Sequence, residues 1–321
     1  LCRYKKMRSQ IYIFIFSILF MGGAYESHYA QQDYLASQYN FNSLMLNPAY
    51  AGAHSYIQFS SMYRNQWKID GAPTSQVFCL DGSLKNAPVG LGLAITSDRI
   101  GVVSEKTFSG DLSYKFRTRL GNVSFGIRAG YVGYSAKLSD LIYWDENDPV
   151  YSNGNVQEGF LTLGFGTFMS ATSGKWYAGL SSPSYYAKDN ILRSSADERF
   201  YNRHYYLYGG GVKSTSMGVD LKPSFLVRYM DNAPILFDLN LHALFMEDGP
   251  SGSQIWVGVG YRSSSTYIAS LEVALPYNLR LGYSYDFAAK GLNTYLGATH
   301  EIQIGFNFGG RTSVIQNPRY F

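Results

Sequence analysis

The sequence has 321 residues, of which 46% are hydrophobic, 17% aromatic and only 16% charged, with a net charge of +4. Globular domains average about 25% charged residues, and two cysteines provide neither a disulfide framework nor a metal site with recognisable spacing. Basic residues are interspersed with acids and form no stripe, which argues against nucleic-acid binding. Abundant tyrosine and glycine with a mean hydropathy of −0.15 suit a chain whose hydrophobic residues alternate with polar ones.

The first 30 residues have the pattern of a secretory signal. Four basic residues between positions 3 and 8 precede an apolar run at residues 11–21, which is shorter than the roughly 20 residues a membrane-spanning helix needs. Cleavage is expected after Ala30, with Ala24 as the alternative site and a signal anchor as the competing interpretation. Cleavage after Ala30 would leave a net charge of +1, because four basic residues and one acidic residue depart.

Residues 31–52 form the next predicted segment, a polar and aromatic stretch without a sustained period that ends in a turn. Pro48 cannot donate to a strand ladder, and Gly52 permits a bend before a first strand at about His54. The motif is either a plain turn or an anchor that holds this segment in the lumen or at the periplasmic mouth of a barrel. The predicted anchoring or partner-binding residues are Asn47, Pro48, Ala49, Tyr50 and Gly52.

From here on the chain alternates apolar with polar or small residues, the period of β-strands. In residues 279–287, for example, Leu279, Leu281 and Tyr283 share one face while Arg280 and Ser284 lie on the other. About fourteen such segments are predicted, at residues 54–64, 74–84, 89–97, 108–117, 123–131, 159–170, 175–180, 204–213, 219–229, 235–245, 255–262, 267–275, 279–287 and 301–308.

These strands predict an all-β fold, a transmembrane antiparallel β-barrel over residues 53–308 with an N-terminal lumenal or plug segment. Strands of about 9–11 residues match a tilted bilayer crossing, and an aromatic-rich apolar face fits lipid better than the core of a soluble sandwich. Every second connection is short, whereas residues 137–158 and 181–204 form long polar joins. Short turns face the periplasm in outer-membrane barrels. Both ends of the mature chain, including a tail at residues 309–321, are therefore predicted to be periplasmic.

Four short motifs resemble the PorP/SprF family. They are Gln31-Gln32-Asp33 with Ser37-Gln38-Tyr39, the motif at residues 47–52, Tyr63-Arg64-Asn65-Gln66-Trp67, and the closing Pro318-Arg319-Tyr320-Phe321. The resemblance implies an outer-membrane barrel of the type IX secretion system, associated with gliding motility. It also implies a large secreted surface adhesin and periplasmic secretion-ring proteins as partners, besides outer-membrane lipid. The turn at Asn47 also resembles the hatch of long-chain fatty-acid transporters, so a hatch-gated channel for apolar small molecules is the alternative.

Candidate sites have ordinary interpretations. Asp238, His242, Ser270 and Glu272 share the predicted lumenal face and suggest a catalytic cluster, but lumenal faces are polar in any barrel. No enzyme activity, cofactor, nucleic acid or small-molecule substrate is therefore expected. The acidic motif at residues 144–149 could supply oxygen ligands to calcium, although a solvated external loop is preferred. Tyr229, Tyr261, Tyr283 and Tyr285 are predicted to form interfacial girdles.

The tail has two possible roles. Pro318, Arg319, Tyr320 and Phe321 are predicted to dock a partner, because arginine and aromatic residues are enriched at the energetic centres of interfaces. The alternative is that terminal aromatics assist barrel assembly.

Overall fold

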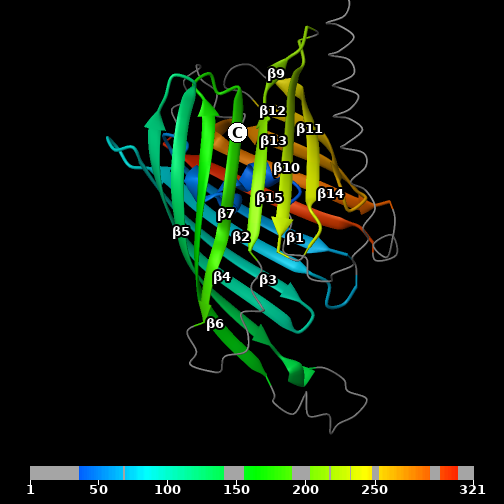
Figure 1. The fold of residues 1–321 in the computed structure, drawn as a ribbon. Coiled ribbons are helices and arrows are strands. Elements are labelled where there is room, and N and C mark those ends of the chain that lie inside the picture. Colours follow the sequence, from blue (N-terminus) through cyan, green and yellow to red (C-terminus); the bar gives the residue numbers. More distant parts are fainter. Residues whose placement is uncertain are drawn as a thin grey trace, which may run out of the picture. The chain divides into compact units, whose positions relative to one another are not determined.

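The fold is a closed β-barrel around its own N-terminal segment. The computed structural model describes residues 36–67, 69–140, 155–189, 203–216, 218–231, 233–247, 253–289 and 297–309. Fifteen antiparallel strands follow one another around the sheet, β9 continues β8 along β10, and the β15–β1 pairing closes the wall (Figure 1). Because β8 and β9 together occupy one position in the wall, the described residues form a closed barrel of fourteen strand positions, which confirms the predicted barrel. We call the end where Ile57 begins β1 and Phe308 ends β15 mouth A, and the opposite end mouth B.

The strands agree with the alternating segments except in length. They are β1 (Ile57–Gln66), β2 (Thr74–Ser83), β3 (Val89–Ile100), β4 (Val103–Arg117), β5 (Gly121–Ala136), β6 (Val156–Ala171), β7 (Trp176–Asp189), β8 (His204–Gly211), β9 (Lys213–Ser214), β10 (Asp220–Met230), β11 (Leu236–Glu247), β12 (Gln254–Arg262), β13 (Thr266–Leu275), β14 (Leu279–Ala288) and β15 (Thr299–Phe308). A further 3-10 turn, η3 (Leu138–Asp140), follows β5, and η4 (Pro276–Asn278) joins β13 to β14.

Several boundaries differ from expectation: β4 begins at Val103 rather than at residue 108, and β5 runs to Ala136 rather than to residue 131. The first strand begins at Ile57 rather than near His54, because its ladder with β15 starts at the pair of Ile57 with Phe308, where β15 ends. The predicted loop at residues 181–204 is strand as far as Asp189. Opposite Gly164, the β6–β7 register shifts around Pro183, which lacks a ladder donor and interrupts the alternation.

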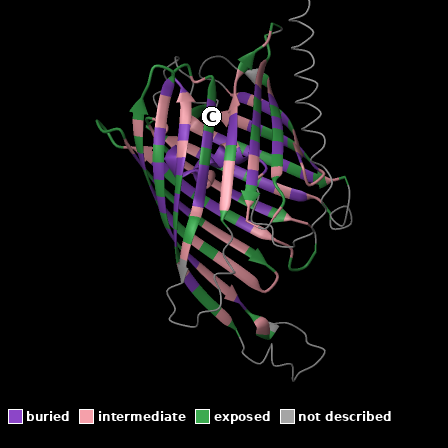
Figure 2. Ribbon diagram, viewed as in Figure 1, coloured by how far each residue is buried: buried purple, intermediate pink, exposed green. Residues whose placement is uncertain are grey.

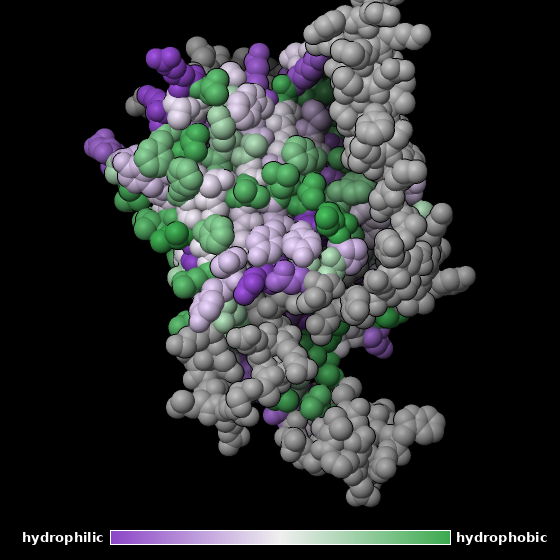
Figure 3. Space-filling model, viewed as in Figure 1, coloured by the Kyte–Doolittle hydropathy of each residue, from purple (hydrophilic) through white to green (hydrophobic). Residues whose placement is uncertain are grey.

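The two faces of the wall are chemically opposite, as the alternation predicts. Leu239 is 52% exposed on the outer face, whereas its neighbours Asp238 and Asn240 are 0% and 7% exposed inside. Buried and exposed residues alternate along the strands (Figure 2), and hydrophobic side chains cover the middle of the visible outer wall (Figure 3). An apolar band outside a polar lumen is the surface of a membrane barrel.

Aromatic rings in mutual contact mark both edges of this apolar band. Near mouth B, Tyr205 stacks on Tyr229, and Tyr267 contacts both Tyr261 and Phe287. Near mouth A, the rings of Tyr114, Phe116 and Phe125 are in contact, as are those of Phe306 and Phe308. Such girdles lie at the membrane–water interfaces of barrels.

Residues 36–56, which we call the plug, fill the lumen and appear in blue within the barrel in Figure 1. They contain three short helices, η1 (Tyr39–Asn42), α2 (Ser43–Leu46) and η2 (Pro48–Tyr50). The plug starts beside Glu301, two residues from the mouth B end of β15, and reaches mouth A beside Asp81 of β2. Among the described residues, no helix has the length and apolar character needed to cross a membrane.

Candidate functional site

The plug lies directly against the backbone of the wall where the wall carries glycine. A Cβ on Gly126 of β5 would collide with the backbone of Ala49, and one on Gly90 of β3 would collide with the carbonyl of Ala51. Gly52 completes this contact with a φ of +64°, a conformation that favours glycine. Larger residues at these positions would therefore push the plug away from the wall.

Asn47 fastens the turn between α2 and η2 to β6. Its side chain is 0% exposed. The Oδ1 atom accepts a hydrogen bond from the Ala49 N–H at 2.9 Å, and Nδ2 donates to the Thr167 carbonyl at 2.8 Å. Pro48 occupies the first turn of η2, where its missing N–H leaves nothing unsatisfied. The structure thus brings the predicted residues from Asn47 to Gly52 together inside the lumen.

An ion-paired cluster near mouth B holds the start of the plug. Arg64 of β1 lies 2.9 Å from both Asp286 and Glu301, and it donates to the Ser37 hydroxyl at 2.8 Å. Glu301 in turn accepts hydrogen bonds from the backbone N–H groups of Ser37 and Gln38 at 2.9 and 3.1 Å. All three charged side chains are at most 6% exposed. Buried bonds of this charge-assisted kind are the strong ones.

A second cluster satisfies the carbonyls at the end of α2. Arg128 of β5 donates to the Leu44 and Met45 carbonyls at 2.6 and 3.0 Å, and it pairs with Asp111 of β4 at 2.6 Å. Carbonyls in the last turn of a helix have no partner within the helix. The guanidinium supplies that partner from the wall.

A third set of contacts holds the plug at mouth A. The Ser113 hydroxyl donates to the Ala51 carbonyl at 2.6 Å, and the Lys115 ammonium donates to the Gly52 carbonyl at 2.7 Å. The Gly52 N–H donates to Asp81 at 3.0 Å. The wall therefore binds the plug backbone from one mouth to the other.

Aromatic packing surrounds η2. The Tyr50 ring meets Phe168 edge-on with 5.3 Å between centroids, and its hydroxyl lies 2.9 Å from Nε2 of His54. Burial, together with the cations Arg280 and Lys115, lowers the pKa of His54 to about 3. The imidazole is therefore neutral at pH 7, because burial and the two cations disfavour its charged form.

The candidate catalytic cluster is divided among separate interactions. Ser270 and His242 do meet, with 3.0 Å between Oγ and Nε2, but Nδ1 of His242 has no hydrogen-bond partner among the described residues. A Ser–His–Asp triad requires a carboxylate at that nitrogen. Asp238 instead pairs with Arg228 and Arg262 at 3.3 and 3.1 Å, and Glu272 pairs with Lys222 and Arg280 at 3.0 and 2.7 Å.

Sequence reasoning missed the residues that hold the plug in place. Arg64 lies in one of the motifs that carry the family resemblance, and its inward direction follows from alternation, but Glu301 is distant in sequence. The sites predicted at residues 144–149 and at Pro318, Arg319, Tyr320 and Phe321 lie outside the described residues. Within the described part of the chain, no group of three or more His, Cys, Asp or Glu side chains could hold a metal ion.

Several solved structures are similar to this chain at low sequence identity. A FadL homologue of Pseudomonas aeruginosa is 10% identical with a TM-score of 0.47, and the match covers 82% of this chain and 93% of that one. The monoaromatic hydrocarbon channel CymD is 11% identical with a TM-score of 0.49, over 84% and 93% of the two chains. Omp33 of Acinetobacter baumannii is 7% identical with a TM-score of 0.43, over 80% and 100%. No curated protein matches the sequence.

The family of the chain follows from its sequence profile. The profile described as Type IX secretion system membrane protein PorP/SprF matches residues 28–306, a span that takes in the plug and nearly all of the wall. The apolar outer band and the aromatic girdles place this wall in an outer membrane. The chain is therefore a member of the PorP/SprF family of type IX secretion system membrane proteins.

Proposed function

We propose that this chain is a non-enzymatic outer-membrane component that docks a large secreted surface adhesin or periplasmic secretion-ring proteins, in a system that also serves gliding motility. The observation that carries the proposal is the filled lumen. A plug bonded to the wall at both mouths favours docking over solute conduction as the work of the barrel.

The charges inside the lumen support a structural role for the plug. Arg64 and Arg128, the two arginines that bond the plug, each have a carboxylate at 2.9 Å or less. An ion-selective pore instead lines its path with charges of one sign. Paired charges fill and stiffen the lumen.

The lengths of the connections support an orientation. At mouth A the joins at residues 84–88, 118–120 and 276–278 are short, whereas the two longest joins, residues 137–155 and 190–203, lie at mouth B, where residues 101–102 and 263–265 also form short joins. Barrels keep short turns in the periplasm, so we assign mouth A to the periplasm and mouth B to the cell surface. Because the number of strands around the wall is even, the wall begins at Ile57 and ends at Phe308 at the same mouth, mouth A. The plug, in contrast, begins toward mouth B, so this orientation directs its first described residues to the external side.

The tail after Phe308 then enters the periplasm, where it can reach ring proteins. Replacing Arg319, Tyr320 and Phe321 with Ala tests this role. Docking predicts a normally folded barrel that no longer co-purifies with periplasmic partners and displays little adhesin. Very little folded barrel would indicate an assembly role instead, and a variant normal in both respects would reject both roles.

Conductance in planar bilayers tests the filled lumen. We expect the intact mature chain to show little steady conductance, and we expect deletion of residues 31–46 to open the barrel. Large constant conductance from the intact chain would contradict the plug. It would favour the alternative, a hatch-gated channel for apolar small molecules.

A further inference from the structure

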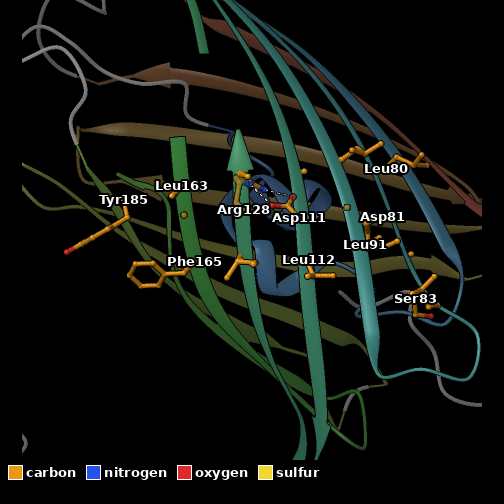
Figure 4. Close-up of a pocket in the computed structure, with 18 of the residues that line it drawn as sticks. Leu80, Asp81, Ser83, Leu91, Asp111, Leu112, Arg128, Leu163, Phe165 and Tyr185 are labelled. Carbon is orange, nitrogen blue, oxygen red and sulfur yellow. Dashed lines mark hydrogen bonds and ion pairs between the residues drawn. The ribbon is translucent and has the colours of Figure 1, made fainter. Parts of the chain in front are cut away.

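The outer face of the wall carries a groove that the proposed function does not use. Its volume is about 960 Å³, and it extends from Ile57 of β1 to Tyr186 of β7. The groove lies within the apolar band, and Leu91, Leu112 and Phe165 on its walls are 47–49% exposed. Figure 4 shows Leu112, Phe165 and Tyr185 on the opposite side of the wall from the Asp111–Arg128 ion pair, which faces the plug. Pockets for organic ligands span about 300–1,000 Å³.

Two small residues on neighbouring strands make the floor of the groove. Gly110 of β4 is paired with Ala129 of β5, and this row continues to Leu93 of β3 and Leu163 of β6. A Cβ on Gly110 would meet no atom within 4 Å. The middle of the row therefore lacks the side chains that cover the wall on either side, and the gap is open toward lipid.

The groove and the plug lie against opposite faces of the same two strands, β4 and β5. One residue along from Gly110 and Ala129, Asp111 and Arg128 turn inward, where Arg128 bonds the end of α2. The plug supports this part of the wall from within. The outer side needs an apolar filling, because an unfilled cavity forfeits the contacts of the atoms that line it.

A cation lies at the end of the groove nearest mouth B. Phe165 and Tyr185 are in ring contact at 5.2 Å, and the guanidinium of Arg203 lies over the Tyr185 ring at 5.3 Å. The Arg203 carbonyl accepts a hydrogen bond from the Asp231 N–H at 3.3 Å, which ties this residue to the end of β10. Aromatic girdles lie at the level of lipid headgroups, and a guanidinium binds phosphate with a fork of two donors.

We propose that this outer groove binds a phosphate-bearing diacyl lipid, with its acyl chains over Gly110 and Ala129 and its phosphate at Arg203. Nearly all the surface of the groove is apolar, which suits acyl chains. The cation at its interfacial end distinguishes an anionic headgroup from an uncharged one. The lipid would complete the wall behind the Asp111–Arg128 cluster.

Native mass spectrometry of the full mature chain released from lipid nanodiscs tests the site. The probes are dioleoyl phosphatidylglycerol and, separately, uncharged dioleoylglycerol with the same chains. We expect about tenfold greater retention of phosphatidylglycerol, the order of effect that a charge-assisted hydrogen bond provides. Arg203→Gln should lower its retention to that of dioleoylglycerol. Inorganic phosphate should not displace the lipid, because most of the contact is apolar.

Filling the groove should remove the lipid without unfolding the barrel. The double variant Gly110→Leu/Ala129→Leu places side chains in the open gap and should lower retention of both lipids by about tenfold. Val259→Phe is the control, since Val259 is 63% exposed on β12 outside the groove. Heat modifiability in gels establishes folding, and Ala129→Leu alone serves if the double variant does not fold. Equal retention by the filled and native groove would overturn the proposal. The proposal would also be overturned if the native chain were a dimer and the double variant a monomer, because the groove would then bind a second copy of the chain rather than a lipid.

Discussion

Arg64→Met should loosen the start of the plug more than any other single change in the lumen. The substitution keeps most of the side-chain length but leaves Asp286 and Glu301 buried without the guanidinium that lies 2.9 Å from each of them. Removing one partner of a buried ion pair costs about 3–5 kcal/mol. Glu301 keeps the N–H donors of Ser37 and Gln38. We therefore expect the lower end of that range, about 3 kcal/mol.

Urea-induced unfolding of the barrel in lipid vesicles, followed by tryptophan fluorescence, measures this loss. Arg64→Lys keeps the charge but not the fork of donors, so its loss should be smaller, about 1 kcal/mol. The triple variant Arg64→Met/Asp286→Asn/Glu301→Gln removes the unpaired charges and should recover part of the stability. If Arg64→Met unfolds at the same urea concentration as the unaltered chain, the cluster does not hold the plug and the reasoning fails.

Three further substitutions test the wall and the plug. Leu239→Arg places a cation in the middle of the outer band and should lower the free energy of unfolding by about 2–4 kcal/mol. Its control, Ile235→Arg, lies on the same face near mouth B and should lower the free energy of unfolding by about 0–1 kcal/mol. Equal losses would contradict the placement of the membrane. Gly126→Leu should displace η2 and raise the conductance in planar bilayers, unlike Gly133→Leu, since a Cβ on Gly133 of the same strand has no contact closer than 3.9 Å. Ser113→Ala should destabilise the plug by about 1 kcal/mol through the lost bond to the Ala51 carbonyl, and unchanged protease resistance of the plug would count against that contact.

The direction of each side chain could be predicted from the sequence because it is a local property. Successive residues of a strand point to opposite faces, so Leu239 and Asp238 could be assigned to lipid and lumen without any knowledge of their neighbours. The same rule failed in the second half of β7. Pro183 and the register shift beside Gly164 interrupt the period there, and a strand without a continuous period cannot be recognised by alternation.

The contacts of the plug could not be predicted for a different reason. Residues 36–56 have no period because their three helices have only three or four residues each, and bonds to the wall hold the turns between and after them. Gly90 and Gly126 are the clearest sign of these contacts in the sequence, but a glycine in a strand can mark either a bulge or a close approach of another backbone. The two causes can be distinguished only once the position of the plug is known.

The ion pairs in the lumen separate into those that a sequence can reveal and those that it cannot. Strands β4 and β5 are joined by three residues, and the pairing of Arg117 with Asn122 next to that turn fixes every later pair of the hairpin, including Asp111 with Arg128. Turn geometry sets the register of a hairpin, so this cluster follows from the sequence once the turn is located. Arg64 and Glu301 meet only because β1 pairs with β15 across the closure of the barrel. Closure has no turn to set its register, and the strand number and shear of the whole barrel decide it. The cluster that holds the start of the plug is therefore a property of the closed barrel, and a change that opens the β1–β15 seam should release the plug even where all of its own residues are intact.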